Sequence, residues 1–190
     1  MTTLVWFRHD LRTLDNTALT EAAKAGEVRG VYLLCPEQLD EHVIAPIRRH
    51  YLRRVLDDLA AQMAALGIPF DIVEAGHFRK VPERLASYCD QHGIERVIAH
   101  REWLVDEQRR DQACEAALPV PLTLVEDNLL GATQVMKGDG DPYKVFTPFS
   151  RQARQHIAND FPVCRRRPKA QGKAYVPETC PVFGEEVSSA

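Results

Sequence analysis

The chain has 190 residues, of which 45% are hydrophobic and 27% charged, and its formal net charge is -3. The proportions are typical of a globular protein with a hydrophobic core, and the length suits one ordinary domain with an extension. The slightly acidic balance excludes a general electrostatic attraction of the whole chain to nucleic acid.

The cysteines and the N-terminus bear on the cellular compartment. Five cysteines are dispersed without any CxxC pair: Cys35, Cys89, Cys114, Cys164 and Cys180. This pattern disfavours a disulfide framework and a zinc site, and it is typical of a reducing cytoplasm. The N-terminal apolar stretch is too short for a signal peptide, and no run approaches the roughly 18 apolar residues of a membrane span. The sequence predicts a soluble cytoplasmic protein without membrane or metal partners.

The first half of the chain alternates short apolar runs with helical patterns. Residues 3–7 (TLVWF) are predicted as a buried strand, and Asp15 as the N-cap of a helix that Gly26 closes. Residues 28–35 form a second strand. Apolar residues at steps of three or four predict a long amphipathic helix near 46–66. Its solvent-exposed face contains Arg48, Arg49, Arg53 and Arg54.

The same alternation continues to about residue 130. The predicted elements are a strand at 69–75, a helix at 81–91, a strand at 96–100, a helix at 106–118 and a strand at 122–127. Strands joined by helices of this length form a parallel sheet that is covered on both faces. Residues 1–130 are therefore predicted as an α/β domain with a doubly wound five-stranded parallel sheet, Rossmann-like or flavodoxin-like.

The pattern changes after this domain. Residues 131–190 are rich in Gly, Asp and Pro, and they are predicted as an extended linker with one short helix near 147–158.

Polar side chains follow the predicted strands at their carboxyl ends, where parallel α/β sheets bind ligands. They come from three loops and are Arg8, His9, Asp10, Glu37, Arg101, Trp103, Asp106 and Glu107. These residues are the candidates for one binding site. The alternative is a loop cluster held by ion pairs, in which Asp10 pairs with Arg8 or Arg12.

Several common functional motifs are missing from the sequence. There is no GxGxxG or GxxxxGK[ST] phosphate loop, no GxSxG nucleophile turn and no metal-binding histidine pair within one helix. His42 and His50 are interpreted as surface residues, and the Arg165–Arg167 run as a solvated part of the linker. No catalytic residue is predicted in this chain.

Two separated motifs resemble the photolyase and cryptochrome family. Residues 6–12 (WFRHDLR), followed by Asp15–Asn16 and Ala18–Leu19, are similar to the family's opening signature. Residues 143–149 (YKVFTPF) are similar to a segment just beyond the α/β domain of microbial cyclobutane-dimer photolyases. The resemblance covers essentially the whole chain and favours a photolyase over a cryptochrome.

The resemblance implies the N-terminal, antenna-binding domain of a deoxyribodipyrimidine photolyase, the enzyme that uses light to repair pyrimidine dimers in DNA. The antenna of this family is methenyltetrahydrofolate or a flavin or deazaflavin. FAD and damaged DNA bind to a helical domain that this chain lacks, so the chain alone is expected to be inactive, as a truncated form or as a separate α/β protein. Tyr143, Phe146 and Phe149 are expected to contact that helical domain.

One pair of residues bears on the choice of antenna. Folate-using members carry an Asn-Glu pair at the start of the fourth helix; here Asp106 replaces the Asn and Glu107 matches the Glu. Asp106 keeps an acceptor but loses the NH₂ donor. The structural alternative is that Asp106 caps this helix and Glu107 is a first-turn acid stabilised by the helix dipole.

Two other functions remain open at this point. A cryptochrome-type blue-light photoreceptor would contain the same domain, and its distinguishing residues would lie in the helical half. A nucleotide-binding domain of the adenine-nucleotide hydrolase type shares the layout, but it requires a glycine-rich loop where this chain has RHDLR and HREWL.

Overall fold

The computed structural model describes residues 1–126, 135–159 and 164–183. The strands are β1 (Thr2–Phe7), β2 (Glu27–Leu34), β3 (Phe70–Glu74), β4 (Arg96–His100) and β5 (Leu122–Val125). The helices are α1 (Thr17–Ala25), α2 (Pro36–Glu41), α3 (Pro46–Ala65), α4 (Val81–His92), α5 (Val105–Ala117) and α6 (Phe146–Asn159), with a 3-10 turn at Phe78–Lys80. Asp127, the predicted end of the fifth strand, lies outside the described residues.

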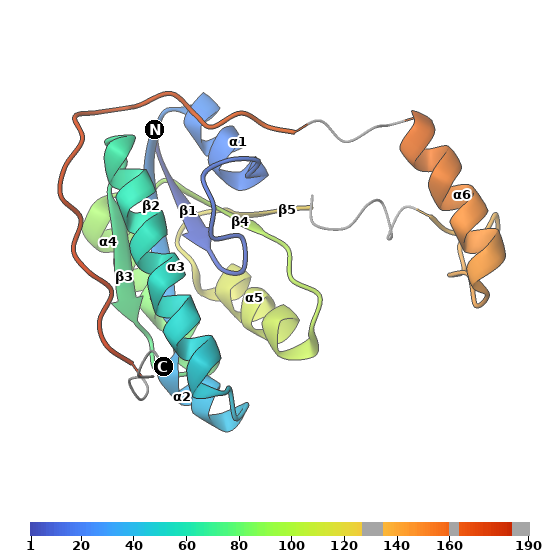
Figure 1. The fold of residues 1–190 in the computed structure, drawn as a ribbon, viewed down its shortest axis with the longest axis horizontal. Helices are drawn as coiled ribbons and strands as arrows, with labels where there is room; N and C mark the ends of the chain where they lie inside the picture. The colour runs from blue at the N-terminus through green and yellow to red at the C-terminus, as the bar shows by residue number, and fades with distance from the viewer. Residues whose placement is uncertain (127–134, 160–163, 184–190) are drawn as a thin grey trace.

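The strands form one parallel sheet in the order β3-β2-β1-β4-β5. The chain winds outward from β1 to β3 and then returns to β4, on the other side of β1. Consequently α1 and α3 cover one face of the sheet, and α4 and α5 cover the other (Figure 1). The predicted doubly wound α/β fold is confirmed. Its winding reverses between β1 and β4, and ligands bind at this point in open α/β sheets.

The two faces of the sheet have separate hydrophobic cores. Val5 and Phe7 of β1 pack with Leu56 and Leu59 of α3, and all four side chains are buried. The alternate residues of β1 contribute to the opposite core, next to α4 and α5. Because successive strand residues point to opposite faces, an uninterrupted apolar run such as TLVWF is suited to a central strand.

The start of α1 differs from the prediction in one residue. Asn16, not Asp15, is the N-cap, since its side-chain oxygen accepts a hydrogen bond from the backbone N–H of Leu19 at 2.8 Å. Asp15 has a φ of 51°, and its carboxylate accepts a bond from the backbone N–H of Arg165 at 2.9 Å. Asp15 is thus engaged by a distant part of the chain, and the next residue caps the helix.

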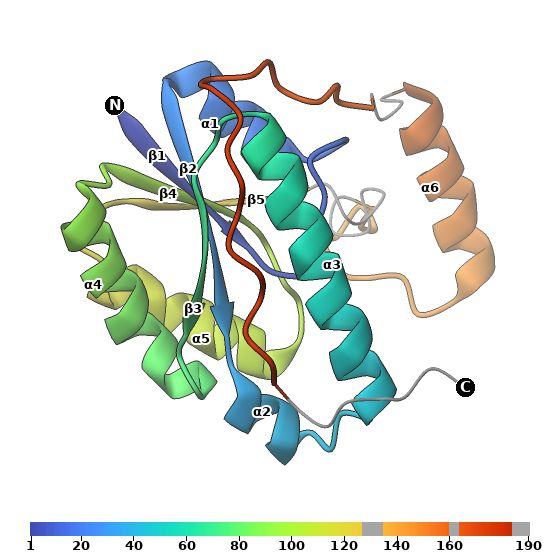
Figure 2. The same ribbon diagram turned by 60° about the vertical axis from the view of Figure 1, so that its left-hand side comes forward.

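Residues 164–183 form an extended segment, here called the strap, that runs along the α/β domain (Figure 2). Gln171 donates its backbone N–H to the Leu66 oxygen at 2.8 Å and accepts the backbone N–H of Val28 at 2.9 Å. The hydroxyl of Tyr175 bonds the Phe70 N–H and the Ile68 oxygen, at 3.1 and 2.9 Å. These residues were predicted as linker; the structure shows that they are extended and packed against the domain.

The strap passes closest to the body of the domain at Gly67. This residue has a φ of +64°, and a Cβ placed on it would lie 2.3 Å from the backbone of Gly172. Only glycine adopts the left-handed conformation without strain and also leaves room for a crossing backbone. Further along the strap, Cys180 is buried in the core between α3 and the sheet.

Helix α6 is separate from the α/β layers in Figure 1. It includes the range predicted for the short helix, and none of its residues is buried. Among the described residues, no helix has the length and apolar character needed to cross a membrane.

Candidate functional site

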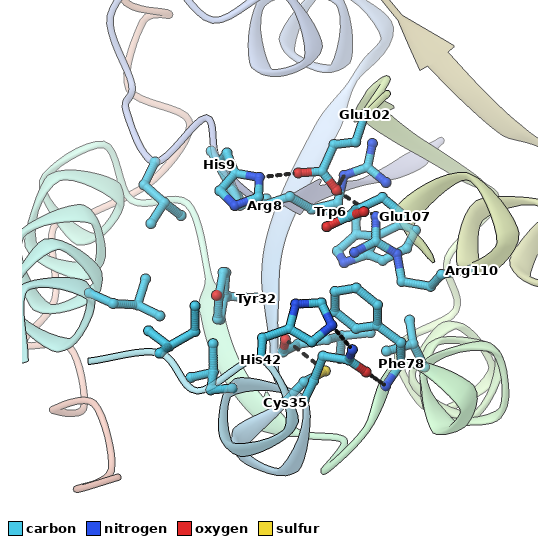
Figure 3. A pocket seen from close by; sticks show the side chains of 18 of the residues that line it. Trp6, Arg8, His9, Tyr32, Cys35, His42, Phe78, Glu102, Glu107 and Arg110 are labelled. Atoms are coloured by element: carbon cyan, nitrogen blue, oxygen red, sulfur yellow. Dashed lines mark hydrogen bonds and ion pairs between the residues drawn. The ribbon is translucent and has the colours of Figure 1, made fainter. Parts of the chain in front are cut away.

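A cavity of about 610 Å³ lies at the carboxyl ends of β1 and β2 and extends to the start of α5 (Figure 3). Apolar and aromatic side chains from β1, β2, α2, α3 and the 3-10 turn line much of it, among them Trp6, Tyr32, Leu39, Tyr51, Leu52 and Phe78. The polar lining residues include Arg8, His9, Gln38, His42, Glu102, Glu107 and Arg110. This combination of an apolar wall with a few polar groups is typical of small-molecule sites.

Three charged residues of the cavity lining, Arg8, Glu102 and Arg110, form a buried network with Asp111 around Trp6. Arg110 donates to Glu102 at 2.6 Å and to Asp111 at 2.8 Å, and Arg8 donates to Asp111 at 2.7 Å. Both guanidinium groups also lie over the indole ring of Trp6, at 4.7 and 4.9 Å from its centroid. Two cations and two carboxylates offset one another here, so the network is electrically balanced.

This network alters the protonation of Glu102. Burial alone would raise the pKa of its carboxyl group, but the hydrogen bond from His9 and the charges of Arg8 and Arg110 outweigh burial and lower the pKa to about 2. The same bond to Glu102 raises the pKa of His9. Glu102 is therefore ionised at every pH near neutrality and is not a proton donor.

A second buried pair lies beneath the first loop. Asp10 accepts a hydrogen bond from Nδ1 of His100 at 2.6 Å, and both side chains are almost fully buried. Burial raises the pKa of Asp10, but the bond from His100 outweighs it and lowers the pKa overall. The predicted alternative was wrong about the partner: His100 pairs with Asp10, whereas Arg8 contributes only its backbone N–H, at 2.8 Å.

The structure brings most of the predicted site residues together. Arg8, His9 and Glu107 line the main cavity. A smaller neighbouring cavity of about 180 Å³ is lined by the same three residues together with Asp10, Arg101 and Trp103.

Two predicted residues lie outside both cavities. The carboxylate of Glu37 lies against Gly76, which follows β3. Asp106 lies in the exposed first turn of α5, 3.9 Å from His42. It is not the helix cap, because the N-cap position is occupied by Leu104 and no side chain caps it.

Glu107 of α5 was predicted as a site residue, whereas Arg110 and Asp111 of the same helix were not. The buried residues of this helix include Glu107, Arg110 and Asp111, which recur at steps of three and four but are charged. A search for apolar periodicity does not detect a helix face of this kind. The spacing of charged residues of both signs could have indicated it. His42, interpreted as a surface residue, is exposed as expected but also lines the cavity.

No metal centre is evident in the part of the chain that the structure describes, since no group of three His, Cys, Asp or Glu side chains is arranged to hold an ion.

Comparisons with known proteins identify the family. The model of the DNA photolyase family matches residues 3–168. Among curated proteins, the chain is 33% identical over 172 residues to a deoxyribodipyrimidine photo-lyase of Salmonella typhimurium, covering 88% of this chain and 36% of the relative. It is 32% identical over 193 residues to the Thermus thermophilus enzyme of the same name, covering 98% of this chain and 43% of the relative.

A solved structure supports the fold. A bacterial class III photolyase from Agrobacterium tumefaciens aligns with a TM-score of 0.71 and 22% identity, over 97% of this chain and 36% of that protein. The chain thus spans 36–43% of the length of these relatives. It belongs to the DNA photolyase family and corresponds to the N-terminal α/β domain of those proteins.

Proposed function

We propose that this domain holds the antenna chromophore of a deoxyribodipyrimidine photolyase. FAD and damaged DNA would then bind to a separate helical domain, and residues 131–190 would connect that domain to the α/β domain at 1–130. The observation that carries the proposal is the cavity of about 610 Å³ at the point where the winding of the sheet reverses.

The lining of the cavity suits a flat, conjugated ring system. The volume lies within the usual range for small-molecule sites, roughly 300–1,000 Å³. Trp6, Tyr32 and Phe78 supply aromatic surface against which such a ring could pack. The bound ring would supply light absorption; the protein would hold it in place and exclude water.

A methenyltetrahydrofolate antenna is the second candidate. Glu107, which matches the acid of the folate-binding pair, lines both cavities. Asp106 lies in neither, and it lacks the amide donor of the Asn that it replaces. The support for a folate antenna is therefore weaker than the support for a flavin-type ring, which rests on the size and lining of the main cavity.

An antenna role also agrees with the balanced charges of the site. Energy passes from an antenna to FAD by dipole coupling, which requires a fixed orientation of the ring and no acid or base. Glu102 is held ionised in ion pairs with Arg8 and Arg110, so it orients neighbouring groups rather than transferring protons.

Chromophore binding tests the proposal. We expect the chain to bind riboflavin, FMN or 8-hydroxy-5-deazaflavin, detected as increased fluorescence anisotropy, and Leu39→Trp to weaken binding at least about tenfold by filling the cavity. Leu14→Trp is the matched control, because Leu14 is exposed and lies outside the cavity. Binding of none of these compounds, or of methenyltetrahydrofolate alone, would exclude a flavin-type antenna.

We further propose that Tyr143, Phe146 and Phe149 contact the helical domain. Phe146 is 76% exposed, Val145 is also exposed, and the rings of Tyr143 and Phe149 pack edge-on at 6.4 Å. An exposed apolar cluster of this kind typically marks an interaction site.

Amide hydrogen exchange tests this contact. We expect residues 143–149 of the 190-residue chain to exchange much faster than β1 or β4, because nothing covers them among the described residues. If residues 143–149 exchanged as slowly as the central strands, they would not form an uncovered docking surface.

A further inference from the structure

The four arginines that line the main cavity differ in their partners. Arg8 and Arg110 are paired with Glu102 and Asp111. The other two, Arg12 and Arg48, form no ion pair with a described carboxylate. Arg12 donates only its Nε, to the backbone oxygen of Asp15 at 2.9 Å. The cavity therefore contains two positive charges that the described part of the protein does not neutralise.

Arg48 occupies an unfavourable position for helix stability. It lies in the first turn of α3, which contains no acidic residue, and a cation at this end of a helix is opposed by the helix dipole. Its neighbour Arg49 is compensated, since it donates to Asp40 at 2.5 Å and to the Ile44 oxygen at 2.8 Å. Arg48 has no such compensation, so its charge and the dipole of α3 both make this wall of the cavity positive.

The opposite wall has a different character. Glu102 and Glu107 line the cavity from the side of α5, and Figure 3 shows them grouped with Arg8 and Arg110 around Trp6, across from α3. Arg8 and Arg110 on that wall already pair with Glu102 and Asp111, so they offer an anionic ligand group less uncompensated positive charge than Arg12 and Arg48 do. A ligand with a neutral ring and an anionic tail would thus be oriented with its tail toward Arg12 and Arg48.

We propose that Arg12 and Arg48 form a subsite for the anionic tail of the antenna, so that the cavity selects flavin-type rings that carry a phosphate or an equivalent acidic tail. The inference rests on the proposed function. It adds the chemical class of the ligand and the residues that discriminate within that class. A ring with a neutral ribityl tail would occupy the same cavity with lower affinity.

The test compares pairs of ligands that differ only in the tail. Riboflavin and FMN form one pair, and 8-hydroxy-5-deazaflavin with and without a phosphodiester-linked lactyl-glutamate tail forms the other. With the 190-residue chain we expect FMN to bind about tenfold more tightly than riboflavin at low salt, and this ratio to fall as salt is added. Arg12→Gln and Arg48→Gln should each reduce the ratio, and the double variant should bring it near one. Arg54→Gln is the control, because Arg54 is an exposed arginine of the same helix outside the cavity.

The outcomes separate the two proposals. If the ligand with the anionic tail binds more tightly in both pairs, the subsite accepts anionic tails in general. If only FMN binds more tightly than its neutral partner, the subsite is specific for a phosphate monoester. Equal binding of riboflavin and FMN to the unmodified chain overturns the subsite and leaves the antenna cavity intact. A preference that survives the double variant, or that Arg54→Gln also removes, overturns the assignment to Arg12 and Arg48. Binding of neither flavin rejects the proposed function itself.

Discussion

Replacing Arg110 by Met is expected to lower the free energy of unfolding by about 3 kcal/mol, the lower end of the usual cost of breaking a buried ion pair. Met retains much of the apolar contact with Trp6 and Phe78 but removes the positive charge between Glu102 and Asp111. Both carboxylates keep Arg8 as a neighbour, which limits the loss. Urea unfolding followed by circular dichroism measures the change.

Arg109→Met is the matched control. The Arg109 side chain is 76% exposed in the same helix, and its single ion pair with Asp106 is a surface contact. A change of less than about 0.5 kcal/mol is expected there, as for other exposed pairs. Equal losses in the two variants would show that the buried network does not stabilise the domain.

The pH dependence of stability provides an independent measurement of the same network. The pKa of Glu102 is about 2 in the folded protein, against an ordinary value of 4.5. Ionised Glu102 therefore stabilises the fold above pH 4.5, and this contribution is lost as the pH falls from 4.5 toward 2. In Arg110→Met the pKa of Glu102 should rise toward its ordinary value, so Glu102 should contribute less to the loss of stability in acid.

Gly67→Ala is expected to destabilise the domain by about 3 kcal/mol and to release the strap. The left-handed backbone at Gly67 costs about 1–2 kcal/mol with any other residue. The new methyl group would also lie 2.3 Å from the backbone of Gly172, so the strap would have to move. That movement would weaken the hydrogen bond between Gln171 and Leu66, at 2.8 Å.

Gly93→Ala separates these two effects. Gly93 has a similar φ of +59°, but a Cβ there would meet nothing within 4 Å, so only the backbone cost of about 1–2 kcal/mol is expected. Limited trypsin digestion reports on the strap, which contains Arg165, Arg166, Arg167, Lys169 and Lys173. Cleavage there should be at least about tenfold faster in Gly67→Ala than in Gly93→Ala. Equal cleavage rates would show that the strap adjusts without detaching.

The strap supports one wall of the cavity. It packs along α3 and β3, and α3 provides one wall of the cavity. Cys180 donates its backbone N–H to Asp57 of α3 at 2.7 Å, so the strap holds the helix that carries Arg48. A strap released by mutation is therefore expected to loosen the side of the cavity that we assign to the tail of the ligand.

Local patterns in the sequence determine the fold of this protein. The apolar runs at β1, β2 and β4 and the apolar periodicity of α3 predict the strands and helices, because burial of apolar side chains depends mainly on their spacing along one element. The alternation of these elements implies the parallel sheet and places the ligand site at its carboxyl ends. The family, too, follows from the sequence, through the motifs at residues 6–12 and 143–149.

Only the tertiary structure decided which polar residues meet. The spacing of residues does not reveal that Asp10 pairs with His100, that Arg110 joins Glu102 to Asp111, or that Asp15 bonds Arg165 instead of capping α1. Each of these contacts joins groups through hydrogen-bond geometry and charge rather than through hydrophobic periodicity, and two of them join residues that are 90 and 150 positions apart. The packing of the strap, which was predicted as an extended linker, was not foreseen for the same reason: its hydrogen bonds to the domain leave no periodic signal in its side chains.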